Sequence, residues 1–154
     1  MLHFWYVHSM LDHIRDKNAL ITMQKAGISK TQQRIAVLNI LSKAATPLNI
    51  SSIRQSLQSK TRINRVTIYR ILSLFKMRGI IRDITSSGIS YYELATRENP
   101  VHPHFNCLNC GKLSCLEPLT FSQAKHLFNT DENFSIEHIE INISGLCSYC
   151  RNAT

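Results

Sequence analysis

The first half of the chain carries apolar residues at helical spacing, interrupted by short polar breaks. In four stretches the apolar residues recur every three or four positions, which is typical of amphipathic helices. Thr31, Asn49 and Asn64 stand where a side-chain oxygen can cap a helix N-terminus. We therefore predict helices over residues 9–26, 31–44, a short stretch after Asn49, and about 64–77.

Beyond Gly79 the spacing changes from helical to strand-like. Residues 80–84 and 90–94 are rich in β-branched and aromatic side chains, and the turn-forming residues 86–88 lie between them. This pattern predicts a β-hairpin. Three helices followed by a hairpin are typical of a winged helix-turn-helix domain.

The last third of the chain mixes short strand-like and helix-like stretches. Residues 95–103 have no period and contain Pro100 and Pro103, so we expect a hinge there. The elements predicted after the hinge are strands over 105–107 and 112–115, a helix over about 119–128, and a strand over 134–143. This part is too small to be stable alone, so we expect it to dimerise and to need a metal.

Four of the five cysteines occur as two C-x-x-C pairs, Cys107 with Cys110 and Cys147 with Cys150. Two intervening residues let both thiolates of a pair face one cation, and two such pairs complete the tetrahedral shell that zinc prefers. A shell of four thiolates leaves no open position, so the zinc is expected to be structural. The alternatives are free thiols or a thioredoxin-like redox pair, but a redox pair opens a helix in a βαβ unit, which the predicted elements lack.

The predicted elements and the zinc site together indicate an α+β protein built from two small domains. The chain has 154 residues, and only small domains need a metal to hold a thin core together. We assign residues 1–94 to a winged helix-turn-helix domain, 95–103 to the hinge, and 104–154 to a small α/β dimerisation domain stapled by the four-cysteine zinc site.

Charge is unevenly distributed between these parts. Residues 1–92 contain 14 Lys and Arg against 3 Asp and Glu, whereas residues 93–154 contain 4 against 7, so the net charges are +11 and −3. A basic half of this kind favours a polyanionic partner, because such surfaces supply the sequence-independent part of DNA affinity. From charge alone, an ordinary solvated basic face is the alternative.

The helix predicted over residues 64–77 strengthens the nucleic-acid interpretation. Its apolar residues gather on one side, and a Tyr-Arg-Ser face gathers on the other. Arginine can pair bidentately with guanine, and tyrosine can contact base methyl groups or phosphate, as a major-groove helix requires. The DNA-binding residues predicted from this helix are Arg65, Thr67, Tyr69, Arg70 and Ser73.

The chain contains no run of 18 apolar residues, so no membrane-spanning segment is predicted. The apolar residues 1–7 lack a basic region and are too few for a signal peptide. We therefore expect a cytoplasmic protein. Reducing conditions there also favour cysteines as metal ligands over disulfides.

Several motifs recur in the order and spacing of one protein family. The most specific is the H-x-H-x-x-C-x-x-C-G-K run that begins at His102. The other segments are Gly27–Arg34, Val66–Leu72, Tyr92–Leu94 and Gly145–Cys150. With them the chain resembles the ferric uptake regulator family of metal-sensing bacterial repressors, from about Ala26 to Arg151. The resemblance implies a homodimer that binds a palindromic operator in double-stranded promoter DNA when loaded with a regulatory divalent metal, usually shutting off transcription.

His102 and His104 are two residues apart, so on a strand both imidazoles face the same way and can share one ion. The resemblance implies that Glu93 and the fifth cysteine, Cys115, complete this regulatory site. Such a set of O, N, N and S ligands favours tetrahedral Zn²⁺ over Fe²⁺ or Mn²⁺, because a thiolate selects a softer ion. Asp83 is a rival for the remaining ligand position.

We therefore expect a metal-responsive repressor that senses zinc and controls metal-uptake genes, similar to the zinc uptake regulator branch of the family. Pro47 supports this branch, because it lies where iron-type members often carry a histidine. An iron- or peroxide-responsive regulator of the same family is the alternative, with Fe²⁺ as the regulatory metal.

An enzyme is the alternative from another class. His138 and Glu140 precede the second cysteine pair and superficially resemble the H-x-E and C-x-x-C motifs of zinc nucleobase deaminases. Only six residues separate Glu140 from Cys147, and no proline precedes that cysteine, so we expect no enzymatic activity.

Overall fold

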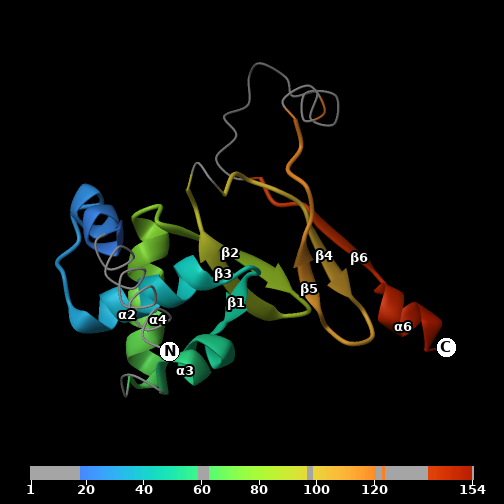
Figure 1. Ribbon diagram of the computed structural model, residues 1–154, viewed down its shortest axis with the longest axis horizontal. Coiled ribbons are helices and arrows are strands. Elements are labelled where there is room, and N and C mark those ends of the chain that lie inside the picture. The colour runs from blue at the N-terminus through green and yellow to red at the C-terminus, as the bar shows by residue number, and fades with distance from the viewer. Residues whose placement is uncertain (1–17, 59–62, 97–98, 121–122, 124–138, 154) are drawn as a thin grey trace, which may run out of the picture.

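The computed structural model describes residues 18–58, 63–96, 99–120, 123 and 139–153. In Figure 1 a helical part with its own sheet is followed by a second sheet that leads to the C-terminal helix. Helices dominate the first part and short strands the second. This is the mixed α+β architecture that the sequence predicts.

Helical segments make up the N-terminal part. Residues 18–25 are helical, and they are followed by α2 (Gln32–Lys43), α3 (Ile50–Gln58) and α4 (Arg65–Met77). The predicted caps Thr31, Asn49 and Asn64 are all confirmed, because each side chain accepts a hydrogen bond from the backbone N–H three residues further on. The rest of the first predicted helix, residues 9–17, lies outside the described residues.

One hydrophobic core lies between these helices. Its most completely buried side chains include Met23, Val37, Ile53, Leu57, Ile68, Leu72 and Phe75. Ile71 on α4 is buried as well, so the inward face predicted for this helix is confirmed. Because that face packs into the core, the opposite face of α4 is turned to solvent.

The predicted hairpin forms a wing beside the helices. Its strands β2 (Ile81–Ser86) and β3 (Ile89–Leu94) pair antiparallel. Ser87 and Gly88 connect them with φ angles of 50° and 74°. Positive φ at both central residues is the type I′ geometry, which matches the twist of a two-residue hairpin.

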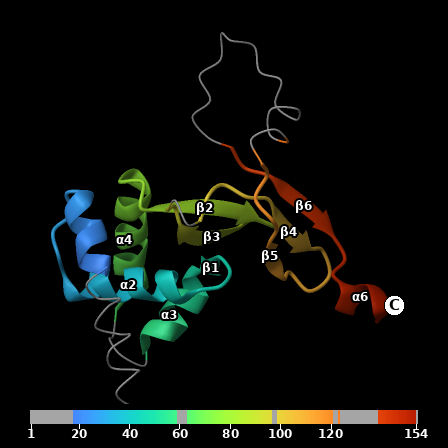
Figure 2. The same ribbon diagram turned by 45° about the horizontal axis from the view of Figure 1, so that its top comes forward.

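A short strand, β1 (Leu48–Asn49), completes this sheet in the order β1-β3-β2. The sequence did not predict β1, because two residues carry no strand periodicity. In Figure 2 the wing extends from α4 towards β4 and β5 of the second sheet. The wing is thus the part of the N-terminal half that reaches the C-terminal half.

The second sheet has the order β5-β4-β6. Its strands are β4 (His104–Cys107), β5 (Leu113–Cys115) and β6 (Asn142–Gly145), and α6 (Ser148–Asn152) follows. β5 pairs antiparallel with β4, and β6 pairs parallel with β4 on its other side. The parallel pairing places Gly145 opposite Cys107, so the two ends that carry the cysteine pairs lie together.

Two predicted elements differ from the structure in their limits. Residues 139–141 are not strand, and β6 begins only at Asn142 and continues to Gly145, beyond the predicted end at 143. Pairing with β4 sets these limits, which local composition could not indicate. In the helix predicted over 119–128, residues 119 and 120 are not helical, whereas 123 is helical. The other residues of that prediction lie outside the described residues.

Among the described helices, none has the length and hydropathy needed to cross a bilayer.

Candidate metal centres and nucleic-acid interface

The four paired cysteines meet at one end of the second sheet. Cys107 ends β4 and Cys110 follows in a turn, whereas Cys147 is the N-cap of α6 and Cys150 lies within that helix. Their sulfur atoms all lie within 4.8 Å of one another, and the sulfurs of Cys110 and Cys147 are 3.8 Å apart. A tetrahedron with Zn–S bonds of ~2.3 Å has edges of ~3.8 Å, so the cluster has the dimensions of a four-thiolate zinc site.

Local electrostatics favour a cation in this cluster. The backbone N–H groups of Cys110 and Cys147 lower the pKa of Cys107 to about 6. Burial and the neighbouring sulfur atoms raise the pKa of Cys150 to about 12. The raised pKa of Cys150 is the expected effect of burial and neighbouring sulfurs, and a zinc ion among the four sulfurs would stabilise their thiolate forms.

A second cluster lies where the wing meets the second sheet. Glu93 comes from β3, His102 from the segment before β4, His104 from β4, and Cys115 from β5. Each offers one ligand atom, and these four atoms all lie within 4.8 Å of one another. The fold thus brings together all four residues that the sequence indicated as regulatory-metal candidates.

The imidazoles of this cluster are buried, and most of their ring nitrogens have no hydrogen-bond partner. His102 and His104 expose only 5% and 3% of their surface. Within the described structure, Nε2 of His102 and both ring nitrogens of His104 lack a hydrogen bond. Their Nε2 atoms lie 3.6 and 3.5 Å from the Glu93 carboxylate, which is longer than a hydrogen bond. A shared divalent cation would satisfy these atoms, and an O, N, N, S donor set suits an ion of borderline softness.

Burial and nearby charges shift the pKa values of the two acidic members of the cluster, Glu93 and Cys115. Burial alone would raise the pKa of Glu93, but the imidazole of His104 and the guanidinium of Arg82 outweigh it and hold that pKa below its ordinary value. Burial and the charge of Glu93 raise the pKa of Cys115. A divalent cation would favour the thiolate of Cys115 and so oppose this rise.

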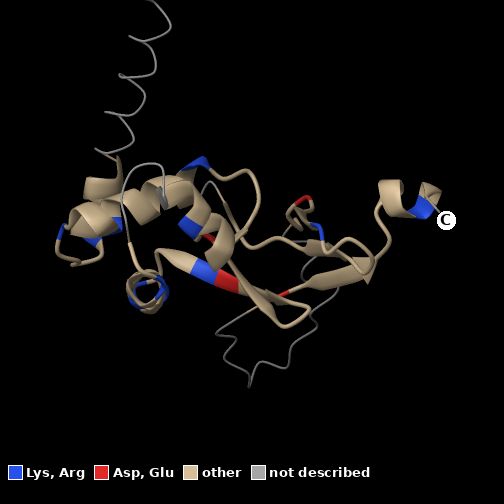
Figure 3. Ribbon diagram, turned by 90° about the horizontal axis from the view of Figure 1, so that it is seen from below, with Lys and Arg blue, Asp and Glu red and all other residues tan. Residues whose placement is uncertain are grey.

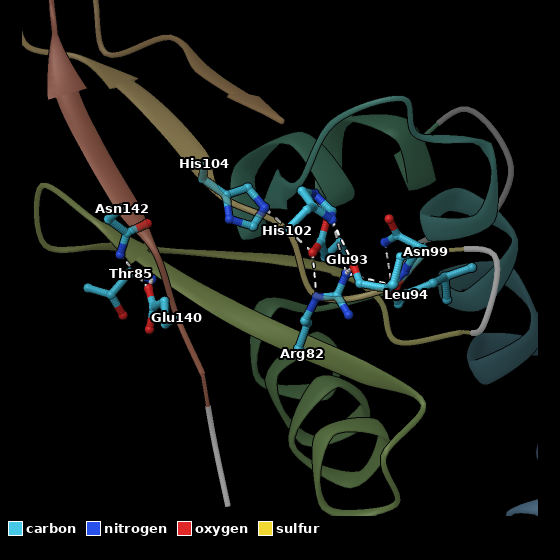
Figure 4. Close-up of polar contacts among 10 residues, drawn as sticks. Arg82, Thr85, Glu93, Leu94, Asn99, His102, His104, Glu140 and Asn142 are labelled. Carbon is cyan, nitrogen blue, oxygen red and sulfur yellow. Dashed lines mark hydrogen bonds and ion pairs between the residues drawn. The ribbon is translucent and has the colours of Figure 1, made fainter. Parts of the chain in front are cut away.

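Arg82 borders the cluster, and the sequence analysis did not identify it (Figure 4). Its Nε donates to Glu93 Oε1 at 2.5 Å, and the two residues are opposite each other in the β2–β3 register. The sequence analysis took residues 86–88 as the turn, and a three-residue turn would have placed Ile81 opposite Glu93. Assigning a two-residue type I′ turn to Ser87 and Gly88 would have placed Arg82 opposite Glu93, as the structure does.

Asp83, the rival ligand, lies outside the cluster. Successive residues of a strand face opposite sides of the sheet, so Asp83 points away from the side that carries Arg82 and Glu93. Its carboxylate instead forms an ion pair with Lys76 of α4 at 2.7 Å. The carboxylate that the wing brings to the cluster is that of Glu93.

The outward face of α4 carries the residues predicted to bind DNA. Those with exposed side chains are Arg65, Tyr69, Arg70 and Ser73, while Thr67 is half-buried. The Arg65 guanidinium lies 5.7 Å from the centre of the Tyr69 ring, a favourable cation–π contact that holds both at the surface. Val66, which the sequence analysis did not single out, is also exposed on this helix. Figure 3 shows Lys and Arg gathered on the helical part of the molecule.

Comparisons with known proteins agree with this geometry. The sequence model of the ferric uptake regulator family matches residues 25–144. The chain is 27% identical over 143 residues to the peroxide-responsive repressor PerR of Staphylococcus epidermidis, covering 92% of this chain and 93% of that protein. The solved ferric uptake regulator of Helicobacter pylori has a TM-score of 0.71 at 20% identity, covering 91% of this chain and 93% of that one. A zinc uptake regulator in complex with zinc and DNA has a TM-score of 0.63 at 20% identity, covering 92% and 96%.

A winged helix joined to a second sheet, with two clusters of metal-ligand type, defines a metal-responsive DNA-binding transcriptional regulator. The chain belongs to the ferric uptake regulator family, whose model covers most of its length. Members of this family bind operator DNA as dimers, and they are regulators and not enzymes.

Proposed function

We propose that this protein is a zinc-responsive repressor of metal-uptake genes that binds its operator as a homodimer. The observation that carries the proposal is the cluster of Glu93, His102, His104 and Cys115, because it joins the wing to the second sheet. When bound there, the ion supplies a link between the two halves of the chain. The DNA-competent geometry need be favoured by only ~1–3 kcal/mol to give a useful switch.

The proposed domain limits follow from assigning DNA binding to the first part of the chain and dimerisation to the last. We propose a DNA-binding domain over residues 1–94, a hinge over 95–103, and a dimerisation domain over 104–154. Cys107, Cys110, Cys147 and Cys150 would hold a structural zinc that contributes directly to the folding of the last part. The distance of 3.8 Å between two of these sulfurs supports this role.

The donor set favours zinc as the regulatory ion. Cys115 offers a thiolate, His102 and His104 offer neutral imidazoles, and Glu93 offers a carboxylate. Four mixed ligands suit tetrahedral Zn²⁺, whereas Fe²⁺ and Mn²⁺ prefer larger shells rich in oxygen and nitrogen.

At the operator, α4 would enter the major groove and the wing would lie beside it. Arg70 and Tyr69 are exposed on the outward face, where they can reach base edges, and Arg65, Thr67 and Ser73 can position the helix on the phosphates. A symmetric dimer presents two such helices, so the operator should be palindromic promoter DNA with two equivalent half-sites.

A peroxide-responsive regulator that uses Fe²⁺ is the second candidate. It is favoured by the similarity to the peroxide-responsive repressor of Staphylococcus epidermidis over 92% of this chain. A cavity of about 260 Å³ lined by Glu93 and Cys115 also gives a small oxidant room beside the proposed site.

The experiment is a gel shift on promoter DNA with the full chain, titrated separately with Zn²⁺, Fe²⁺ and Mn²⁺. Glu93→Ala should abolish metal-dependent binding, whereas Glu117→Ala, at an exposed carboxylate outside the cluster, should not. Binding that requires Fe²⁺ and is lost on treatment with peroxide would replace the zinc proposal with the second candidate. Tight operator binding that no metal changes would overturn both.

A further inference from the structure

Arg82 occupies the space between the wing and the hinge (Figure 4). Its side chain is 16% exposed and that of its partner Glu93 is 8% exposed. A guanidinium buried to this degree is costly unless its donors are used. They are used three times, by Nε to Glu93 at 2.5 Å and by Nη2 to the carbonyl oxygens of Asn99 at 2.9 Å and Pro100 at 2.8 Å.

Two of these contacts orient members of the proposed regulatory site, Glu93 directly and His102 through Pro100. Nε of Arg82 donates to Oε1 of Glu93 and so holds the carboxylate with both oxygens at the cluster: Oε1 lies 3.5 Å from Nε2 of His104, and Oε2 lies 3.6 Å from Nε2 of His102. The carbonyl of Pro100 accepts from Arg82 and also lies 2.8 Å from Nδ1 of His102. Donation by Nδ1 fixes the tautomer, so that Nε2 presents its lone pair to the cluster.

None of these bonds needs a metal ion. They join β2 to the hinge residues 99 and 100 at one end of the wing. At the other end, the N–H of Thr85 donates to Glu140 at 3.3 Å, and the amide of Asn106 donates to the Ser87 hydroxyl at 3.1 Å. The wing is therefore held to the hinge at one end and to the C-terminal part of the chain at the other.

We infer that Arg82 is a positioning residue, which fixes the wing carboxylate and the hinge relative to each other before the regulatory ion binds. This step rests on the proposed function: by holding these groups in place, Arg82 raises the affinity of the proposed regulatory site for its metal. The acceptors of Arg82 lie on β3 and on two hinge carbonyls, so they require the planar fork of a guanidinium and not merely a positive charge.

The test uses the full-length dimer with its structural zinc in place and Co²⁺ as the probe. Coordination of Co²⁺ by the thiolate of Cys115 produces a charge-transfer absorbance that can be titrated. Arg82→Met should raise the dissociation constant about 10- to 100-fold, the usual loss for a residue that orients metal ligands. Arg82→Lys keeps the charge without the fork and should also bind at least about tenfold more weakly. Lys76→Met is the control, because Lys76 of α4 pairs with Asp83 on the face of β2 opposite to Arg82, and this variant should bind Co²⁺ like the wild type.

A second readout follows the hinge without the regulatory metal. In Arg82→Met the backbone amide of Asn99, which donates to Thr96, should exchange hydrogen faster than in the wild type, whereas in Lys76→Met it should not. Equal protection of this amide, wild-type affinity in Arg82→Met, or full recovery of affinity in Arg82→Lys would each overturn the inference. The proposed function fails if the wild type binds no Co²⁺ beyond the structural site, or if His102→Ala binds Co²⁺ as well as the wild type does. In that case hydrogen exchange still decides whether Arg82 holds the hinge.

Discussion

His104 and Cys115 lie directly opposite each other in the antiparallel register of β4 and β5. Two of the four proposed regulatory ligands are therefore placed by one ladder of backbone hydrogen bonds and not by a loop. Glu93 joins them from another sheet. The pair His104 and Cys115 supplies the fixed part of the site, and the wing supplies the part whose position a metal can control.

Replacing the sulfur of this pair tests the metal. Cys115→Ser should abolish zinc-dependent operator binding and leave the four-cysteine zinc and the dimer intact. Losing the thiolate should weaken Zn²⁺ far more than Fe²⁺ or Mn²⁺, because the remaining ligands are harder. Metal titrations of operator binding measure this difference, and His102→Ala should lose the response as well. Unchanged zinc-dependent binding in Cys115→Ser would reduce Cys115 to a packing residue.

The four-cysteine cluster should behave as part of the fold. Cys107→Ser should lose one tightly held zinc per chain and the dimer, because the metal contributes to folding. Elemental analysis of protein purified without added metal measures the zinc, and light scattering measures the dimer. Cys115→Ser is the matched control, since it removes a thiol outside this cluster. A folded, dimeric Cys107→Ser protein without zinc would contradict the assignment.

Arg70 on α4 should read a base. Arg70→Ala is expected to cost ~1–3 kcal/mol in operator binding and to relax the sequence preference at one position of each half-site. Binding assays on operators with single base changes, at several salt concentrations, measure both effects. Equal weakening on every DNA sequence, with a shallower salt dependence, would show that Arg70 contacts phosphate.

The N-cap of α4 should stabilise the DNA-binding half without touching either cluster. Asn64 accepts a hydrogen bond from the N–H of Thr67 at 2.7 Å, so Asn64→Ala should lower the free energy of unfolding by ~1 kcal/mol. Asn64→Asp keeps the acceptor and should be close to neutral. Denaturant unfolding followed by circular dichroism compares the two variants, and the prediction fails if they unfold alike.

Much of this arrangement could be predicted from local sequence. The caps, the inward face of α4 and the hairpin all depend on neighbours a few residues apart, and all were found. β1 and the limits of β6 depend on pairing with distant strands, so composition did not reveal them. The pairing of Arg82 with Glu93 was missed for a related reason: it depends on the strand register, and a turn of three residues instead of two shifts that register by one residue. Among the candidate regulatory ligands, the spacing of His102 and His104 indicated a pair that can share one ion, whereas Glu93 and Cys115 were found by family resemblance, since no local pattern links them.

The parallel pairing of β4 and β6 has a consequence for the order in which a newly made chain folds. Cys107 and Cys147 are 40 residues apart, so the second sheet cannot close until almost the whole chain has been synthesised. The wing closes through a two-residue turn, and the helices before it are built from local contacts that form early. A nascent chain can thus complete the winged-helix part before the second sheet, and the four-cysteine cluster can form only when β6 has joined β4.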